Sequence, residues 1–363
     1  GDGAREAGAG RAPAVPTATT TRGPGASTSC ATASGWALDE DAGRKVDAGR
    51  TWAASRTPSA LVAAEEAAWA AWHTTPPGGL SATQRDLWLQ SNVVLRMGQV
   101  REPGRGFGQI LASLPPGLGF VDAQWNIAWV RDMAYAVVGL IRAGHMDEAE
   151  AALRFQIEAG PGLRTAEVGG PYRISATRYF GNGQEETDCN ADGPNIEFDG
   201  FGLYLWTLGE YLRAGGDLEF VRDFYPELRD GVADVLSNLI DDEGIVAADS
   251  SIWEVHWNGR QKRFTYTSLA AARGLCDAAM IAERLGEAAD QTRFATAGAQ
   301  VRDALVELHT DERGTLAQSR EDPDPGFQYI YAAAIEAENW GIVFPARRLA
   351  RATGQVTLDN PTV

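Results

Sequence analysis

Cysteine, histidine and long apolar runs are all scarce in this sequence of 363 residues. The three cysteines, Cys30, Cys189 and Cys276, lie far apart and are odd in number, so they indicate neither a disulfide framework nor a zinc site. The four histidines show no paired spacing of the kind that binds metals. We therefore expect no bound metal and no cofactor.

The sequence also lacks the segments that would indicate membrane insertion or export. No window holds eighteen consecutive apolar residues, and the chain opens with Gly1 rather than with a basic start leading into an apolar run. A transmembrane helix is therefore not predicted, and the N-terminus gives no information about export or compartment.

Positive charge is in short supply. Lys and Arg number 32 against 49 Asp and Glu, which gives a formal net charge of -17 at pH 7. Such a surface repels nucleic acid and anionic membranes, so neither is expected as a partner. An uncharged ligand such as a sugar is compatible with it. The eleven tryptophans could cover the apolar faces of a pyranose ring, although Trp serves protein cores equally well.

The domain organisation follows from a change of composition near residue 50. A hydrophobic content of 44% is sufficient for one large domain. Residues 1–50 are rich in Ala, Gly, Thr, Ser and Pro without an apolar period, which is typical of a linker or disordered segment. We expect residues 51–363 to form the globular domain, with a first helix from Trp52 to Trp72.

From residue 82 onward the pattern predicts an all-α fold, because apolar residues recur three or four apart in segments that Gly or Pro ends. Some segments are apolar nearly all round and others carry charged faces, which indicates an inner ring of helices wrapped by an outer ring. Long connections precede the inner helices, and long loops at one end of a scaffold are where sites are usually built. The expected helices span 82–98, 129–143, 147–158, 197–214, 218–240, 265–286, 290–308, 327–337 and 345–352.

Two charged residues, Arg131 and Asp132, stand at the start of an apolar helix, shortly after Trp125 and Trp129. Charges in such a place cost free energy unless they are paired or bonded to polar groups. A sugar hydroxyl can accept a hydrogen bond from the guanidinium and donate one to the carboxylate. Alternatively, the two residues form an ion pair in which Asp132 serves the helix N-terminus. The residues alone leave both interpretations open.

A second candidate is Glu254, which follows Ile252 and Trp253 in the loop before the helix at 265 and precedes Val255 and Trp257. Glycoside hydrolysis needs a carboxylic acid whose pKa is raised by an apolar setting, and this segment could supply one. The alternative is a surface glutamate in an aromatic-rich loop.

A third candidate, Asp192, lies in a turn-forming run ahead of the helix at 197. It could belong to the same site, or it could be an ordinary turn or capping residue. We interpret His145, Cys189 and Cys276 as structural, because they lack partners in the sequence.

Three motifs resemble glycoside hydrolase family 15, the glucoamylases and their bacterial relatives, and the similarity runs from about residue 80 to the end. Ser113-Leu114-Pro115-Pro116 followed by Trp125-x3-Trp129-x-Arg131-Asp132 is similar to the family's SLP…(Tyr/Trp)-x3-W-x-R-D signature. Ala191-Asp192-Gly193-Pro194 resembles its D-G-P turn, and Ile252-Trp253-Glu254 resembles the segment that carries its general acid. The resemblance implies an (α/α)6 barrel and an inverting glycosidase that releases glucose from the non-reducing end of an α-glucoside or oligosaccharide, without a cofactor.

The resemblance also implies a role for each residue. Arg131 and Asp132 would bind the 4- and 6-hydroxyls of the terminal glucose, and Glu254 would protonate the glycosidic oxygen. The pocket would be lined by Trp129, Trp253 and the carbonyl of Ile252, with Asp192 in the neighbouring turn. Trp125 stands where the family commonly has a Tyr, which keeps an aromatic face but loses the hydroxyl.

Two departures from the family pattern concern the leaving-group side of the pocket. Val255 stands where fungal members have a second Glu, and no Trp lies between Trp129 and Trp206, although fungal members carry one just before the D-G-P turn. Preference for α-1,4-linked starch is therefore not implied, and trehalose, isomaltose and other short α-glucosides remain open.

The general base is not identified by the resemblance. In the family it follows most of a barrel of six inner and six outer helices, and Glu336 and Glu338 come too early for that place. We therefore expect a barrel that is incomplete at the C-terminus, with the base beyond Val363. Trehalase-, debranching- or phosphorylase-type barrels and a non-catalytic carbohydrate-binding or regulatory barrel are the alternatives.

Overall fold

A computed structural model describes residues 47–49, 51–52, 55–114, 125–254, 259–308, 316–322 and 332–342. The chain divides into two compact units, residues 1–75 and 76–363. Several sequence predictions lie outside the described residues: the linker over 1–46, the helix at 345–352, the start of that at 327–337, and Cys30, Pro115, Pro116, Val255 and Trp257. None of the described helices is long and apolar enough to cross a membrane.

The first unit contains helix α2, Pro58–Trp72. The helix begins at Pro58 rather than near Trp52, because the Thr57 side chain accepts a hydrogen bond from the backbone N–H of Ala60 and so caps the N-terminus. Proline suits the first helical position, where its missing N–H has no partner to lose.

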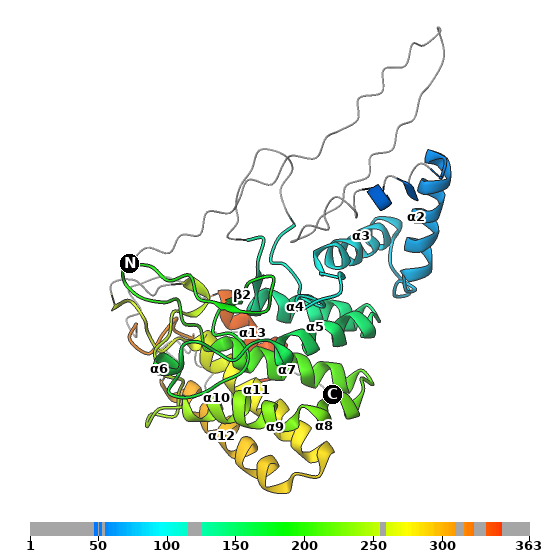
Figure 1. Cartoon of the computed structure of the whole chain (residues 1–363). Coiled ribbons are helices and arrows are strands. Elements are labelled where there is room, and N and C mark those ends of the chain that lie inside the picture. The colour runs from blue at the N-terminus through cyan, green and yellow to red at the C-terminus, as the bar shows by residue number, and fades with distance from the viewer. Residues whose placement is uncertain are drawn as a thin grey trace. The chain divides into compact units, whose positions relative to one another are not determined.

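The second unit is mostly helical (Figure 1). Six predicted helices, those at 82–98, 129–143, 147–158, 197–214, 265–286 and 290–308, are confirmed to within two residues at each end. The helices are α3 (Ala82–Gly98), α4 (Val130–Arg142), α5 (Met146–Glu158), α6 (Thr165–Val168), α7 (Asp199–Arg213), α8 (Leu218–Asp223), α9 (Tyr225–Leu228), α10 (Asp234–Asn238), α11 (Thr265–Leu285), α12 (Ala288–Leu308) and α13 (Glu336–Asn339).

The helix predicted over 218–240 is wrong as a single element. It is divided into α8, α9, a π-helical turn at Arg229–Ala233 and α10. Pro226 lies in the first turn of α9, and a proline inside a longer helix would remove a hydrogen bond and clash with the preceding turn. The chain therefore stops α8 at Asp223 and starts again.

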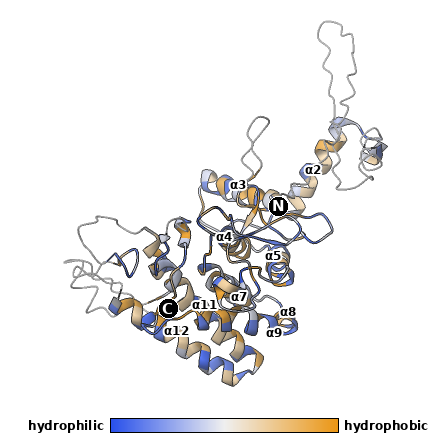
Figure 2. Cartoon of the chain, turned by 60° about the vertical axis from the view of Figure 1, so that its left-hand side comes forward, coloured by the Kyte–Doolittle hydropathy of each residue, from blue (hydrophilic) through white to orange (hydrophobic). Residues whose placement is uncertain are grey.

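The helices form two layers. Helix α7 packs between α4 and α11, and each of the three carries more buried apolar side chains than any other described helix. Helix α5 covers α4 and α7, while α12 lies along α11 (Figure 1). Figure 2 shows hydrophilic residues along α8, α9 and α12. The predicted alternation of inner and outer helices is confirmed for this part of the chain.

Helices α7 and α11 touch through glycines. A Cβ added to Gly202 would lie 2.3 Å from the carbonyl oxygen of Ala270, and one added to Gly274 would lie 2.5 Å from the Cα of Gly202. Real Cβ atoms do not approach so closely, so only glycine permits this backbone-to-backbone contact. The contact fixes how near the two inner helices lie.

The long connection between α5 and α7 is tied down by a small sheet and a buried carboxylate. Strands β1 (Ala128–Trp129), β2 (Arg178–Tyr179) and β3 (Glu185–Glu186) pair antiparallel in that order. Glu185, which is buried, accepts hydrogen bonds from the backbone N–H groups of Leu163 and Ala176 and from the Tyr172 hydroxyl. The sheet attaches this loop to Trp129, the residue before α4.

Candidate active site

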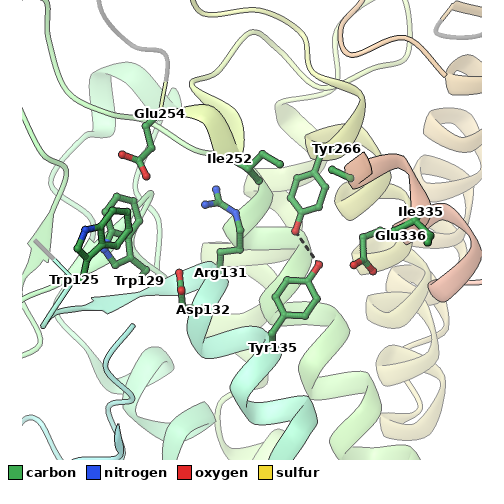
Figure 3. Close-up of a pocket in the computed structure, with 11 residues that line it drawn as sticks. Trp125, Trp129, Arg131, Asp132, Tyr135, Ile252, Glu254, Tyr266, Ile335 and Glu336 are labelled. Carbon is green, nitrogen blue, oxygen red and sulfur yellow. Dashed lines mark hydrogen bonds between the residues drawn. The ribbon is translucent and has the colours of Figure 1, made fainter. Parts of the chain in front are cut away.

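One cavity gathers residues from three separate stretches of the chain. It has a volume of about 440 Å³ and is lined by Trp125, Trp129, Arg131, Asp132, Tyr135, Ile252, Glu254, Tyr266, Ala333, Ile335 and Glu336. That volume falls in the range of roughly 300–1,000 Å³ typical of small-molecule sites. Figure 3 shows Glu254 at one end beside the two tryptophans, Glu336 at the other end, and Arg131 and Asp132 between them.

Two stacked indole rings form the wall below Glu254. The ring centroids of Trp125 and Trp129 are 5.7 Å apart with an interplanar angle of 24°. Trp129 is buried and lies under the guanidinium of Arg178, 4.8 Å from ring centroid to Cζ, whereas Trp125 is 41% exposed. A fixed inner ring that supports an open outer ring presents a flat apolar face to the cavity.

Arg131 is held from behind by two buried carboxylates at the start of α7. Its Nε donates to Oδ2 of Asp199 at 2.8 Å, and its Nη2 donates to Oε2 of Glu197 at 2.5 Å. The ion pair with Asp132 that the sequence left open is not formed. Among the described residues every hydrogen bond of this guanidinium uses Nε or Nη2, so the Nη1 group remains for a ligand.

A third buried carboxyl group, Asp249, lies near the two that bind this guanidinium. Asp249 joins Glu197 and Asp199 by accepting hydrogen bonds from the backbone N–H of Phe198 at 2.9 Å and from the Thr267 hydroxyl at 2.9 Å. Burial raises the pKa of Glu197 to about 8, against the opposing effect of Arg131. Burial, with the nearby Asp199 charge, also raises the pKa of Asp249. Glu197 therefore holds a proton near neutral pH.

Tyr135 lies one turn after Arg131 and Asp132 on α4, because residues three or four apart lie one above the other on a helix. All three side chains line the cavity. Asp132 opens into the cavity, and the protein around it displaces enough water to raise its pKa, although Arg131 lowers it. The Tyr135 hydroxyl lies 3.1 Å from that of Tyr266, the second residue of α11. The cavity thus has a polar end on the side of Arg131 and Asp132 that faces away from the two tryptophans (Figure 3).

Glu254 sits on strained backbone. Its φ is 53° and its ψ 38°, and Ser251, three residues earlier, has a φ of 51°. Such left-handed conformations are uncommon for residues other than glycine and cluster at functional sites. The Glu254 carboxyl points toward the Trp125 and Trp129 rings (Figure 3). Ile252 lines the cavity between Glu254 and Tyr266.

Two residues expected at the site do not line this cavity. Trp253 is 49% exposed, and Asp192 lies exposed in a turn closed by hydrogen bonds between Asn190 and Gly193. The backbone N–H of Asp192 donates to the Asn190 side chain at 2.8 Å. The turn leads through Asn195, which donates to Glu197 at 2.8 Å, into the cluster behind Arg131.

Sequence reasoning missed several residues of the site. Glu197 and Asp199 lie at the start of an apolar helix, just as Arg131 and Asp132 do. The free-energy cost of unpaired charges at such a place could therefore have indicated them as well. Tyr135 could have been found from its position one helical turn after Arg131. Tyr266 and Glu336 carry no such local signal, because only the packing of α11 and α13 brings them to α4. Among the described residues no group of three His, Cys, Asp or Glu side chains could hold a metal ion.

Fold and cavity together define a class: a two-layered helical barrel with its pocket at the ends of the inner helices. The sequence model described as glycosyl hydrolases family 15 matches residues 91–338. The chain belongs to this family, and its fold is the family's (α/α)6 barrel. A search of the curated proteins found no match.

Several solved structures are similar to this chain over part of its length. A single-substitution variant of a glycosidase is similar with a TM-score of 0.52 and 21% identity, over 75% of this chain and 69% of that one. A bacterial glucoamylase complexed with acarbose has a TM-score of 0.46 and 18% identity, over 65% of this chain and 31% of that one. The glucoamylase from Saccharomycopsis fibuligera has a TM-score of 0.49 and 14% identity, over 64% and 51%. This chain thus spans about a third to a half of the length of the two glucoamylases.

Proposed function

We propose that this protein hydrolyses α-glucosidic bonds from the non-reducing end and releases glucose with inversion, with Glu254 as the general acid. One observation carries the proposal. Arg131 and Asp132 from α4 and Glu254 from the loop before α11 line the same cavity, beside a flat aromatic wall. Membership of a glycoside hydrolase family supports the reaction class.

The cavity supports a division of labour between its residues. The free Nη1 of Arg131 would donate to a sugar hydroxyl and Asp132 would accept from one. These two residues of α4 would thus bind the terminal sugar ring. The stacked indoles would cover the apolar face of the ring near Glu254. Glu254 would then donate its proton to the glycosidic oxygen as the bond to the anomeric carbon breaks.

Inversion requires a second carboxylate that activates water on the opposite face of the ring, with the two carboxyl groups roughly 6.5–9.5 Å apart to leave room for the water. Water adds at the anomeric carbon, its proton goes to this base, and the leaving sugar keeps the proton from Glu254. The first product is therefore β-glucose. Maltose, isomaltose and trehalose are the substrates to compare.

The test is Glu254→Gln in the full chain. We expect glucose release to fall by roughly 100- to 10,000-fold, the usual worth of general-acid catalysis, while sugar binding changes little. The matched control is Glu338→Gln, at an exposed glutamate that does not line the cavity, and it should keep wild-type turnover. Unchanged turnover in Glu254→Gln would refute the role of Glu254.

The wild type distinguishes the other reaction classes. β-Glucose as the first product supports inverting hydrolysis, whereas a requirement for phosphate would indicate a phosphorylase. Calorimetric binding of maltose without any glucose release would indicate a carbohydrate-binding barrel and would overturn the proposed hydrolysis.

A further inference from the structure

Glu336 reaches the cavity from a stretch of chain that the sequence motifs do not include. It is the first residue of α13, and Figure 3 shows its carboxylate turned toward the Tyr135 hydroxyl, at the end of the cavity away from Glu254. The Nδ2 of Asn339 donates to Oε2 of Glu336 at 3.2 Å. The carboxylate is thus oriented by its own helix while it faces the cavity.

Helix α13 is anchored firmly enough to position this carboxylate. Trp340, the residue after the helix, is buried between Trp206 and Tyr266, with ring centroids 5.6 and 5.7 Å away. Its carbonyl oxygen accepts a hydrogen bond of 3.0 Å from Nη1 of Arg273 on α11. Large aromatic contacts of this kind fix a short helix that has little stability of its own.

Tyr135 couples Glu336 to the rest of the cavity. Burial raises the pKa of Tyr135, and the neighbouring Glu336 carboxylate raises it further, although the hydrogen bond with Tyr266 opposes this shift. The Tyr135 hydroxyl therefore stays protonated and can donate to Glu336 or to a ligand. This end of the cavity accordingly offers a carboxylate acceptor beside two hydroxyl groups.

The charges that line the cavity are unbalanced. Asp132 and Glu336 contribute two carboxyl groups besides Glu254, which the proposed function keeps protonated, and Arg131 is the one basic side chain among the lining residues. Its guanidinium is already paired with the Asp199 carboxylate behind the cavity wall, beside the protonated Glu197. The carboxylates of the cavity would repel an anionic ligand, because no further basic side chain among the lining residues balances them, and they would attract a cationic ligand.

We propose that Glu336 is a specificity-determining residue, which favours a terminal sugar bearing a hydroxyl or an ammonium group and disfavours one bearing a carboxylate. This inference rests on the proposed function, because it assumes that the cavity binds the terminal ring of a glycoside. It adds to that function the charge class of the substrate: neutral or cationic glycosides, as opposed to uronides.

The test uses three ligands that differ only in the charge at one carbon: methyl α-D-glucoside, its 6-amino-6-deoxy analogue and methyl α-D-glucuronide. Dissociation constants are measured by NMR titration with the full chain at about pH 6, where the amine is protonated. We expect the wild type to bind the amino sugar more tightly than the glucoside, and the uronide at least about tenfold more weakly than the glucoside.

Two variants test whether Glu336 causes this preference by ligand charge. Glu336→Gln should bring the affinities for the amino sugar and the uronide closer together by about tenfold, because the neutral amide removes one of the carboxylates that line the cavity and keeps the shape. Glu338→Gln removes an equal charge two residues further along α13 at an exposed position and should leave all three affinities as in the wild type.

The outcomes separate this inference from the proposed function. If the wild type binds the glucoside but shows no preference by charge, or if Glu336→Gln leaves the preference unchanged, the role of Glu336 is refuted and sugar binding stands. If Glu338→Gln abolishes the preference as fully as Glu336→Gln does, the effect belongs to the net charge of α13 and the proposal also falls. If the wild type binds none of the three, both the inference and the proposed sugar site fail.

Discussion

The Nε atom of Arg131 donates a hydrogen bond of 2.8 Å to Oδ2 of Asp199, although the two residues are 68 positions apart and stand at the beginnings of different inner helices. Asp199 is 1% exposed and Arg131 16% exposed. The orientation of the Arg131 guanidinium in the cavity is therefore set by α7 as much as by α4.

We expect Asp199→Asn to destabilise the fold strongly, because it leaves the Arg131 charge beside a Glu197 carboxyl that holds a proton. Breaking a buried ion pair by removing one partner typically costs about 3–5 kcal/mol. Urea unfolding of the two proteins gives the difference. Asp192→Asn, in an exposed turn, should stay within about 0.5 kcal/mol of the wild type. Equal losses in both variants would contradict the importance of this contact.

The stacked indoles predict a graded loss of sugar affinity. Trp125→Ala removes the exposed ring of the pair and should weaken maltose binding by about tenfold, whereas Trp125→Tyr keeps an aromatic face and should lose less. Isothermal calorimetry measures both. Trp52→Ala, which removes another exposed tryptophan, from the first unit, serves as the control and should bind like the wild type. Full affinity in Trp125→Ala would exclude the indole wall from the binding site.

The carboxyl cluster predicts a dependence of stability on pH. The pKa of Glu197 is raised to about 8 from an ordinary value of 4.5. Between these values the folded protein holds a proton that the unfolded chain has released, so its contribution to stability falls as the pH rises. The slope for one proton is at most about 1.4 kcal/mol per pH unit.

Glu197→Gln removes the carboxyl group that binds this proton. The variant should lose less stability than the wild type between about pH 5 and pH 8, whatever its stability at the lower pH. Denaturant unfolding at several pH values gives both slopes, and parallel slopes would show that Glu197 does not titrate in this range.

The left-handed backbone at Glu254 predicts an unusual order of stabilities. Glu254→Gly should be more stable than Glu254→Ala by about 1 kcal/mol, because glycine adopts a φ of 53° without the steric cost that any Cβ incurs. Both variants lose the same carboxyl, so their comparison isolates the backbone. Thermal unfolding measures the difference, and the reverse order would show that the conformation carries no strain.

The sequence was sufficient for the parts of the fold that depend on local patterns. Apolar spacing and glycine stops located α4, α5, α7, α11 and α12, because these helices bury one face or the whole surface. The spacing also located α3, although only Asn92 and Gly98 of that helix are buried. The pattern failed over 218–240, where the apolar spacing continues through Pro226 although the helix does not. The small sheet was also missed, since strands of two residues have no period to detect.

The site could be predicted only in part, and for a definite reason. Arg131, Asp132 and Glu254 lie in motifs whose order along the chain suggested a shared cavity, and the structure brings them together. Glu336 was set aside because of its early position in the family order, yet α13 carries it into the cavity by packing Trp340 against Trp206 and Tyr266. Such a placement depends on contacts across the fold, which local sequence does not encode.

The glycine contact between α7 and α11 bears on how the specificity of this protein could be redesigned. Asp199 and Glu197 lie within a few residues of Gly202, and Tyr266 lies two turns before Gly274, so the main chains themselves determine the width available at the bottom of the pocket. Substituting smaller side chains for the residues that line the pocket would make it deeper but not wider. A bulkier substrate would require a wider separation of the two helices, and alanine at Gly202 is the smallest change that would impose one.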